Sequence, residues 1–204
     1  MKNSRKNPVP AKYHHGDLRR AIMEAAVEMI EETGLEKMSL REIARKLGVT
    51  TAAPYHHFKD RHALMVALAQ EGYAELLATL STSRSDAGSA AAELDAAVLA
   101  FLRFALRRRA VYTVMLSSEL VEDHRTGELK LPGEMSFEAA RSSIAKSSGL
   151  GFKESAEAAF CVWAMLSGIS RLAIGGVLRE STEEQERLAL RGARGIVRGF
   201  ADQG

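Results

Sequence analysis

Two pairs of adjacent histidines, His14-His15 and His56-His57, are the side chains in this 204-residue chain that most resemble metal ligands. Histidine pairs that bind one ion from a helix are spaced four residues apart, on the same face. Adjacent residues on a helix point about 100° apart, so neither pair can hold one ion from a regular helix. No Cys lies near them and no Glu is spaced as a partner. We therefore expect neither a metal site nor a cofactor.

Nucleophiles and phosphate-binding loops give no better candidate. Cys161 is the single cysteine and lies in an apolar run, where an inert buried thiol is expected. Ser117-Ser118 and the scattered carboxylates form no catalytic constellation. The sequence carries no strand pattern, so no Gly-rich loop follows a strand. We predict that the chain is not an enzyme and has no catalytic residue.

The segment TTAAPYHHFKD, residues 50 to 60, holds polar and aromatic groups that suit contact with DNA. At about 100° per residue, a helix would divide its side chains between two arcs. One arc, which we expect to face a partner, carries Thr51, Ala52, Tyr55 and His56. The other, which we expect to pack, carries Ala53, Pro54, His57 and Phe58. Polar groups of the first arc can reach phosphates or base edges, and a small alanine can approach a thymine methyl group.

Three short helices are predicted to position this segment. The first runs from about residue 17 to 33. The second follows a capping box, Ser39-Leu-Arg-Glu42, is about eight residues long and ends at Gly48. Thr50 is expected to cap the third helix, which places Pro54 in a first turn, where a proline costs little. A capped short helix, a Gly turn and a second short helix indicate a helix-turn-helix, although a plain helical corner is the alternative.

The remainder of the chain reads as further helices. Asp60 is expected to cap a helix from about 61 to 80, and residues 81 to 89 form a polar linker. Apolar periodicity predicts helices near 89–108, 110–121, 134–148, 153–176 and 182–201, with a loop at 127–134. The predicted fold class is therefore all-α. It comprises a flexible basic arm at 1–12, a helix-turn-helix domain at 13–60 with the connecting helix, and a helical domain at 81–204.

Charge and composition favour a nucleic-acid partner and a soluble protein. Residues 1–62 hold 12 Lys/Arg against 8 Asp/Glu, a balance of +4, and residues 63–204 have a balance of −2. A basic end of this kind suits DNA. Arg171 and several Ser and Gly residues dilute the apolar run 160–178, so we expect a buried helix and no membrane span. We expect a cytoplasmic protein without a signal peptide.

The run SLREIARKLGVTTAAPYHHFKDRHALM closely resembles the DNA-binding domain of the TetR family of bacterial transcriptional regulators. Tyr55-His56-His57-Phe58 stands where that family usually has Tyr-x-His-Phe. The motif YHHGDLRR and the residues Trp163 and Gly168 resemble one branch with a Trp-containing C-terminal domain. Ser167 replaces the His common in that branch, which argues against His-dependent chemistry there. Taken together, the expected DNA-contacting residues are Ser39, Thr50, Thr51, Ala52, Tyr55, His56, His57, Lys59 and Arg61.

The resemblance also implies roles for the C-terminal helices. Family members bind small effectors in an apolar site, for which the candidates are Phe101, Phe104, Tyr112, Met115, Phe160 and Trp163. They act as homodimers, and the candidate interface residues are Leu166, Ala189, Gly192, Ala193, Ile196, Gly199 and Phe200. In each case the alternative is an ordinary core residue. We expect a homodimeric, ligand-responsive repressor that binds a (pseudo)palindromic operator in double-stranded DNA and is released by an apolar or amphipathic molecule. The alternative is a helical small-molecule- or metal-binding protein that does not regulate DNA.

Overall fold

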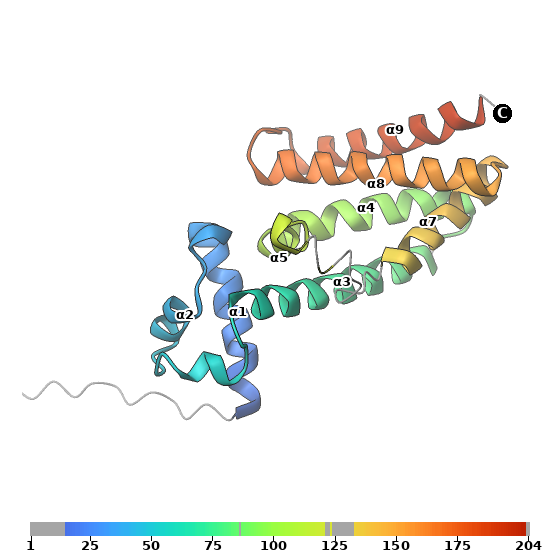
Figure 1. The fold of residues 1–204 in the computed structure, drawn as a ribbon. Coiled ribbons are helices and arrows are strands. Elements are labelled where there is room, and N and C mark those ends of the chain that lie inside the picture. The colour runs from blue at the N-terminus through green and yellow to red at the C-terminus, as the bar shows by residue number, and fades with distance from the viewer. Residues whose placement is uncertain (1–14, 86, 121–122, 124–132, 203–204) are drawn as a thin grey trace, which may run out of the picture. The chain divides into compact units, whose positions relative to one another are not determined.

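The computed structural model describes residues 15–85, 87–120, 123 and 133–202. Every regular element in these residues is a helix, which confirms the all-α prediction (Figure 1). Internal contacts divide the chain into two compact units, residues 1–68 and 69–204, here called unit 1 and unit 2. The predicted arm and most of the predicted loop at 127–134 lie outside the described residues.

Unit 1 is built from short helices whose ends follow from capping groups. Its elements are α1 His15–Thr33, the 3-10 helix η1 Leu35–Lys37, α2 Leu40–Leu47, the 3-10 helix η2 Ala53–His56 and the start of α3 Arg61–Ser85. Ser39 caps α2 as predicted, because the Glu42 N–H donates to its hydroxyl at 3.2 Å. The reciprocal half of the predicted capping box is wrong. The Glu42 carboxylate pairs with Arg45 instead, one turn further along α2.

The core of unit 1 lies where α1 packs against α2. Ile22 and Ala26 of α1, and Ile43 and Ala44 of α2, are fully buried. The small alanines let the two helix backbones approach closely, so the short α2 is held by packing more than by its own propensity. Below this layer, the Arg19 guanidinium lies 5.0 Å from the centre of the buried Phe58 ring. The predicted inner face of α2 is thus confirmed at its centre.

Helix α3 begins as predicted and ends later than predicted. Asp60 caps it, because the Ala63 N–H donates to the Asp60 carboxylate at 2.8 Å. Residues 81–85, assigned to a polar linker from sequence, continue the helix. The hydroxyls of Thr82 and Ser83 donate back to carbonyls one turn earlier, Thr82 to Ala78 at 3.0 Å and Ser83 to Thr79 at 2.8 Å. Such bonds let Ser and Thr remain in a helix that their propensity alone disfavours.

Unit 2 contains the rest of α3 and a group of helices that pack on one another. These are α4 Ala90–Arg107, α5 Arg109–Met115, the 3-10 helix η3 Ser118–Leu120, α7 Gly133–Ser148, α8 Phe152–Ile174 and α9 Thr182–Ala201. The helix predicted at 110–121 ends early, and a turn and η3 follow it. Helix α8 packs against α7, α9 and α4. Ser181 and Glu184 form a complete capping box at the start of α9.

Two bidentate ion pairs join α4 to α9. Arg103 donates to Glu186 at 2.7 and 2.9 Å, and Arg194 donates to both carboxylate oxygens of Asp95. The hydrogen bond from Arg103 lowers the pKa of the Glu186 carboxyl. Bidentate pairs of this kind fix orientation as well as adding energy. They set the register of α9 along α4.

Helix α8 is long and strongly apolar. By length and composition alone it could cross a membrane. The core helix of a soluble protein passes the same test, and α8 packs against its neighbours and fully buries polar Ser155 and Ser170. We therefore read α8 as a helix of unit 2 that is buried on one side. About a third of its apolar window is buried, so the buried helix expected from sequence is confirmed only in part.

Candidate nucleic-acid interface

The turn between α2 and η2 is made by Gly48. Its φ of 66° and ψ of 25° lie in the left-handed region, which glycine enters without a steric penalty. The Val49 N–H donates to Ala44 at 3.0 Å and the Gly48 N–H to Arg45 at 3.2 Å. These two bonds form a Schellman motif. The sequence-based prediction of a Gly-stopped helix and a tight turn is confirmed.

The segment after this turn is a 3-10 helix and not the α-helix predicted. The Ala53 N–H donates to the Thr50 carbonyl at 3.0 Å, and the Tyr55 N–H donates to Ala52 at 3.1 Å. Both bonds join residues three apart. The cause is Pro54, which has no N–H and whose ring clashes with a carbonyl four residues earlier. Thr50 therefore accepts through its backbone carbonyl, and the predicted cap by its hydroxyl is wrong, because η2 has no side-chain cap.

The two predicted faces of this segment are nevertheless confirmed. Side chains of one face are exposed, namely Thr51, Ala52, Tyr55 and His56. Side chains of the other face are buried or half-buried, namely Ala53, Pro54, His57 and Phe58. Each residue turns by about 120° around the axis of a 3-10 helix and by about 100° in an α-helix, so the side-chain directions differ little over a single turn. The error in helix type therefore did not change which side chains face outward.

The exposed face is held by packing beneath it. Phe58 is 3% exposed and Pro54 is buried, whereas Tyr55 is 48% exposed. The His57 and Phe58 N–H groups both donate to the Pro54 carbonyl at 3.0 Å, which closes the turn. The four outward residues thus stand on a fixed base and are open to a partner. Such a face can meet a DNA groove without rearranging the unit.

The remaining predicted DNA-contacting residues lie at the two ends of this face. Thr50 and Lys59 are exposed, and Ser39 is half-buried at the start of α2. The Ser39 hydroxyl already accepts the Glu42 N–H and retains its own proton to donate. The positive ends of α2 and α3 both lie within unit 1, where they favour a phosphate.

Arg61 has a contact that the sequence did not predict. Its guanidinium donates through Nε to the Met38 carbonyl at 3.1 Å and through one terminal nitrogen to the Leu35 carbonyl at 3.0 Å. Both carbonyls belong to the segment between α1 and α2. No sequence pattern signals this contact, because its partners are backbone groups more than twenty residues away. The structure thus ties the first turn of α3 to the entrance of α2.

Three of the four paired histidines, His15, His56 and His57, lie within the described residues. Within the described residues, no group of three or more His, Cys, Asp or Glu side chains could hold a metal ion. His56 is exposed and His57 half-buried, on different sides of η2. His14 lies outside the described residues. The geometry leaves these imidazoles to contact water or a partner.

The predicted effector residues divide into two groups. Phe101, Phe104, Tyr112 and Met115 are buried together in unit 2. Phe160 and Trp163 are 58% and 45% exposed on α8, so they do not share this burial, and their assignment to an effector pocket stays a prediction. Helix α8 is apolar around most of its circumference, and periodicity could not tell which side faces the core. Their rings lie 5.8 Å apart on the outer side of the helix.

Three of the predicted dimer residues face the interior of the protomer. Leu166, Ala189 and Ala193 are at most 4% exposed and pack inside the protomer. Gly192 faces the Met165 side chain of α8, which leaves no space for a Cβ. These positions join α8 to α9 within one chain. Of the remaining predicted residues, Ile196 and Phe200 are half-buried and Gly199 is exposed.

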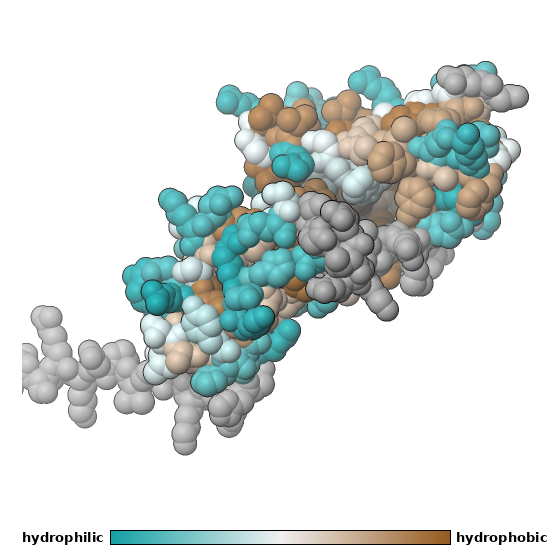
Figure 2. All heavy atoms as spheres, viewed as in Figure 1, coloured by the Kyte–Doolittle hydropathy of each residue, from teal (hydrophilic) through white to brown (hydrophobic). Residues whose placement is uncertain are grey.

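The exposed sides of α8 and α9 form a different apolar surface, here called the α8–α9 face. On α8 it holds Phe160, Cys161, Ala164, Gly168 and Leu172, and on α9 it holds Leu188, Gly195 and Gly199. From Cys161 to Leu172 on α8 the spacings are three, four and four, and from Leu188 to Gly199 on α9 they are seven and four, as on one side of a helix. Figure 2 shows apolar side chains gathered over these two helices. The exposed Cys161 was expected to be buried, which is a further correction.

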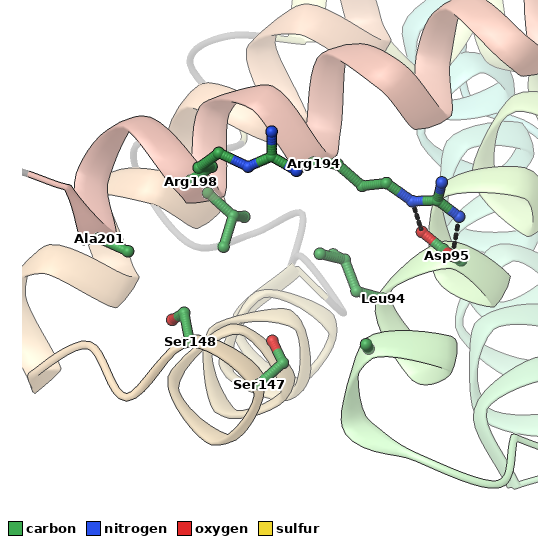
Figure 3. A pocket seen from close by; sticks show the side chains of 9 residues that line it. Leu94, Asp95, Ser147, Ser148, Arg194, Arg198 and Ala201 are labelled. Atoms are coloured by element: carbon green, nitrogen blue, oxygen red, sulfur yellow. Dashed lines mark hydrogen bonds and ion pairs between the residues drawn. The ribbon is translucent and has the colours of Figure 1, made fainter.

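A hollow of about 270 Å³ opens between α4, α7 and α9. Figure 3 shows side chains from these three helices around it, with Arg194 turned to its ion pair with Asp95. None of the predicted effector residues lines it. Its opening toward solvent and its ion-paired wall make it a surface groove, distinct from the buried aromatic cluster.

Comparison with protein families gives two matches that together span most of the chain. The family described as "Bacterial regulatory proteins, tetR family" matches residues 22–68. The family described as "Tetracyclin repressor-like, C-terminal domain" matches residues 94–201. The first match covers the core of unit 1 and the second covers most of unit 2.

Individual relatives agree with these families. The class C tetracycline repressor protein of Escherichia coli is 40% identical over 68 residues, which are 33% of this chain and 31% of that protein. An HTH-type transcriptional repressor of Mycobacterium tuberculosis is 32% identical over 74 residues, 36% of this chain and 40% of that protein. The matched segments therefore span well under half of these curated relatives.

Solved structures extend the similarity over nearly the whole chain. A protein of unknown function from Rhodococcus sp. RHA1 is 31% identical, with a TM-score of 0.70, and the match covers 94% of this chain and 99% of that one. A TetR variant from Acinetobacter baumannii AYE, solved in complex with minocycline, is 22% identical, with a TM-score of 0.63, 93% of this chain and 97% of that one. The latter likeness shows the shared fold.

Proposed function

The chain belongs to the TetR family of bacterial regulatory proteins, and from this premise we propose that it is a homodimeric, ligand-responsive repressor of transcription. Regulators of this family are DNA-binding proteins with a ligand-binding C-terminal domain, and they are not enzymes. The observation that carries the proposal is the exposed Thr51–His56 face on its buried base. This face supports DNA binding. We propose the cytoplasm as the place where the protein acts.

The DNA contacts we propose come from both ends of this face. Tyr55, Thr51 and Lys59 would reach phosphates, and Ala52 would meet a thymine methyl group. The face offers few groups that can read a base edge by hydrogen bonds, since two alanines and a proline occupy its first turn. We infer that DNA shape and phosphate positioning supply much of the specificity.

The α8–α9 face is our proposed dimer interface. Its small residues Cys161, Ala164 and Gly168 would let a second α8 approach closely, and Leu172 and Leu188 supply apolar area at its edges. A contiguous apolar face of this kind on a soluble protein marks an interaction site. A symmetric pair of α8 and α9 helices would form a four-helix bundle, in which the same residues meet their copies.

The effector is proposed to act by changing the preference between two states of the dimer. A helix-turn-helix dimer reads two half-sites that are about one helical turn, or a multiple, apart. A small molecule that binds one arrangement of the two reading units more tightly shifts the population toward it. The family neighbour that was solved with minocycline supports a small-molecule effector of some kind.

A mobility-shift series on DNA fragments around the protein's own gene tests the proposal. We expect a sequence-selective shift that weakens steeply as salt increases, because phosphate contacts release counterions. Footprinting of the shifted fragment should reveal two related half-sites. Binding that is indifferent to sequence at every fragment and salt concentration would refute the proposed function.

A further inference from the structure

Three hydroxyl groups are buried close to one another in unit 2, and none of them makes a well-formed hydrogen bond with a described residue. They belong to Tyr112 on α5 and to Ser167 and Ser170 on α8. Tyr112 is 2% exposed and Ser170 is fully buried. The two serines are three residues apart, so they lie on one side of α8. That side is turned toward Tyr112 of α5. Trp163 lies four residues before Ser167 and seven before Ser170, on the same side of α8.

The three groups form a cluster. Burial raises the pKa of the Tyr112 phenol, and the adjacent hydroxyls of Ser167 and Ser170 partly offset that rise. The Tyr112 ring meets Phe101 edge-on, with ring centres 5.9 Å apart, and Phe101 is itself buried. The cluster is therefore a small polar spot inside an apolar, aromatic surrounding.

A neighbouring tyrosine shows how such a hydroxyl is normally satisfied. Tyr73 on α3 donates its phenol proton to the Met115 carbonyl at 3.2 Å. Burial, with a smaller contribution from Tyr112, raises the pKa of Tyr73 to about 12. Both phenols therefore remain neutral near physiological pH. Tyr112 is buried more deeply and lacks the bond that Tyr73 has.

Unpaired hydroxyls in a core are costly and need a reason. A buried polar group without a partner destabilises the fold by about 1–3 kcal/mol, whereas an apolar side chain of the same shape carries no such penalty. Natural cores therefore pair almost all such groups, and the exceptions often mark a functional site. Phe at 112 and Ala at 170 would fill the same space without this cost. The cluster is a place where a bound oxygen atom would gain several hydrogen bonds at once.

We propose that Tyr112, Ser167 and Ser170 receive the oxygen of a neutral, mostly apolar molecule, such as an alcohol or a carbonyl compound. The inference rests on the proposed function, because it names the chemical class of the effector. Each hydroxyl can both donate and accept, so the three can surround either kind of oxygen. All three hydroxyls are neutral, and the charge that acts on Tyr112, on Arg171, belongs to a solvent-exposed side chain. Bringing a charged group into this apolar surrounding would be strongly unfavourable.

Thermal unfolding of the full chain with three probes of equal chain length tests this. The probes are 1-hexanol, hexanoate and hexylammonium at one shared millimolar concentration. We expect 1-hexanol to raise the Tm of the wild type and the two ions to raise it less or not at all. Tyr112→Phe and Ser170→Ala should each lose most of the 1-hexanol shift. Without probe, both variants should unfold at or above the wild-type temperature, since each removes an unpaired hydroxyl.

Tyr73→Phe is the matched control. It removes the same phenol oxygen from a site where that oxygen is already bonded. We expect a lower Tm than that of the wild type without probe and a preserved response to 1-hexanol. If Tyr112→Phe fails to fold, Ser170→Ala makes the comparison alone, since it removes a single oxygen from a helix.

The proposal is overturned if 1-hexanol does not shift the wild type, if all three probes shift it equally, or if both variants keep the full shift. A lower Tm for both variants without probe would also overturn it, because their hydroxyls would then be satisfied by water. A wild type that responds to 1-hexanol but binds no operator would instead refute the proposed function alone.

Discussion

The Arg61 guanidinium donates to the Met38 carbonyl at 3.1 Å and so joins the first turn of α3 to the entrance of α2. A second bond, to Leu35, uses another nitrogen of the same planar group. Arginine can serve two carbonyls in this way because its donors are fixed in a fork, which a lysine cannot reproduce. The residue that family resemblance places at the DNA is therefore also a structural tie within unit 1.

We predict that Arg61→Lys destabilises the protein by about 1–3 kcal/mol, because a single ammonium group cannot maintain both bonds. Urea unfolding followed by circular dichroism would measure the loss. The matched control is Arg41→Lys, which makes the same change at an exposed position of α2. Equal stability of the two variants would show that the carbonyl contacts of Arg61 contribute nothing.

Tyr55→Phe should weaken operator binding by about three- to tenfold, the loss expected for one hydrogen bond. Because the Tyr55 ring is 48% exposed, the change should leave the unfolding midpoint unaltered. Fluorescence anisotropy with a labelled operator measures the affinity. Tyr73→Phe removes a phenol oxygen from unit 2 and should bind the operator like the wild type. Unchanged affinity in Tyr55→Phe would remove its hydroxyl from the DNA contacts.

Ala164→Glu should convert the dimer into a monomer. The substitution puts a charge in the middle of the α8–α9 face, where the two copies would bring like charges together. Sedimentation velocity at several protein concentrations reads out the oligomeric state. Ala78→Glu introduces the same residue at an exposed position of α3 and should leave the dimer intact. A dimer that persists in Ala164→Glu would show that another surface pairs the subunits.

The Glu93 carboxylate should make stability depend on pH. It accepts hydrogen bonds from Ser143 at 2.7 Å and Arg84 at 3.3 Å, and these lower its pKa from 4.5. Since the folded pKa is the lower one, its stabilising contribution is full above the unfolded pKa and is lost as pH falls through the folded pKa. The stability difference between the wild type and Glu93→Gln should therefore be largest near neutral pH.

Urea unfolding at about pH 7 and about pH 3.5 would measure this difference on both sides of the transition. Glu71→Gln, at an exposed position of α3, controls for the general effect of removing a carboxylate. If the difference in unfolding free energy between the wild type and Glu93→Gln is the same at both pH values, the hydrogen bonds of Glu93 do not favour its charged form.

The local features of unit 1 could be predicted from sequence because each depends on a few adjacent residues. Ser39 and Asp60 cap helices through bonds to residues three positions away, and Gly48 supplies a left-handed turn that other residues resist. The outward and inward sides of residues 51–58 also followed from spacing alone. These are short-range effects of backbone geometry, so they can be predicted from adjacent residues in the sequence.

What only the tertiary structure decided is which neighbour each apolar side meets. Helix α8 is apolar on most sides, so its sequence did not distinguish the buried Leu166 from the exposed Phe160. Likewise, nothing near Tyr112 in the sequence reveals that its hydroxyl faces Ser170 from another helix. Helical periodicity gives the direction of a side chain around its own axis. The partner on that side depends on how distant helices pack, and that packing is settled only when the chain folds.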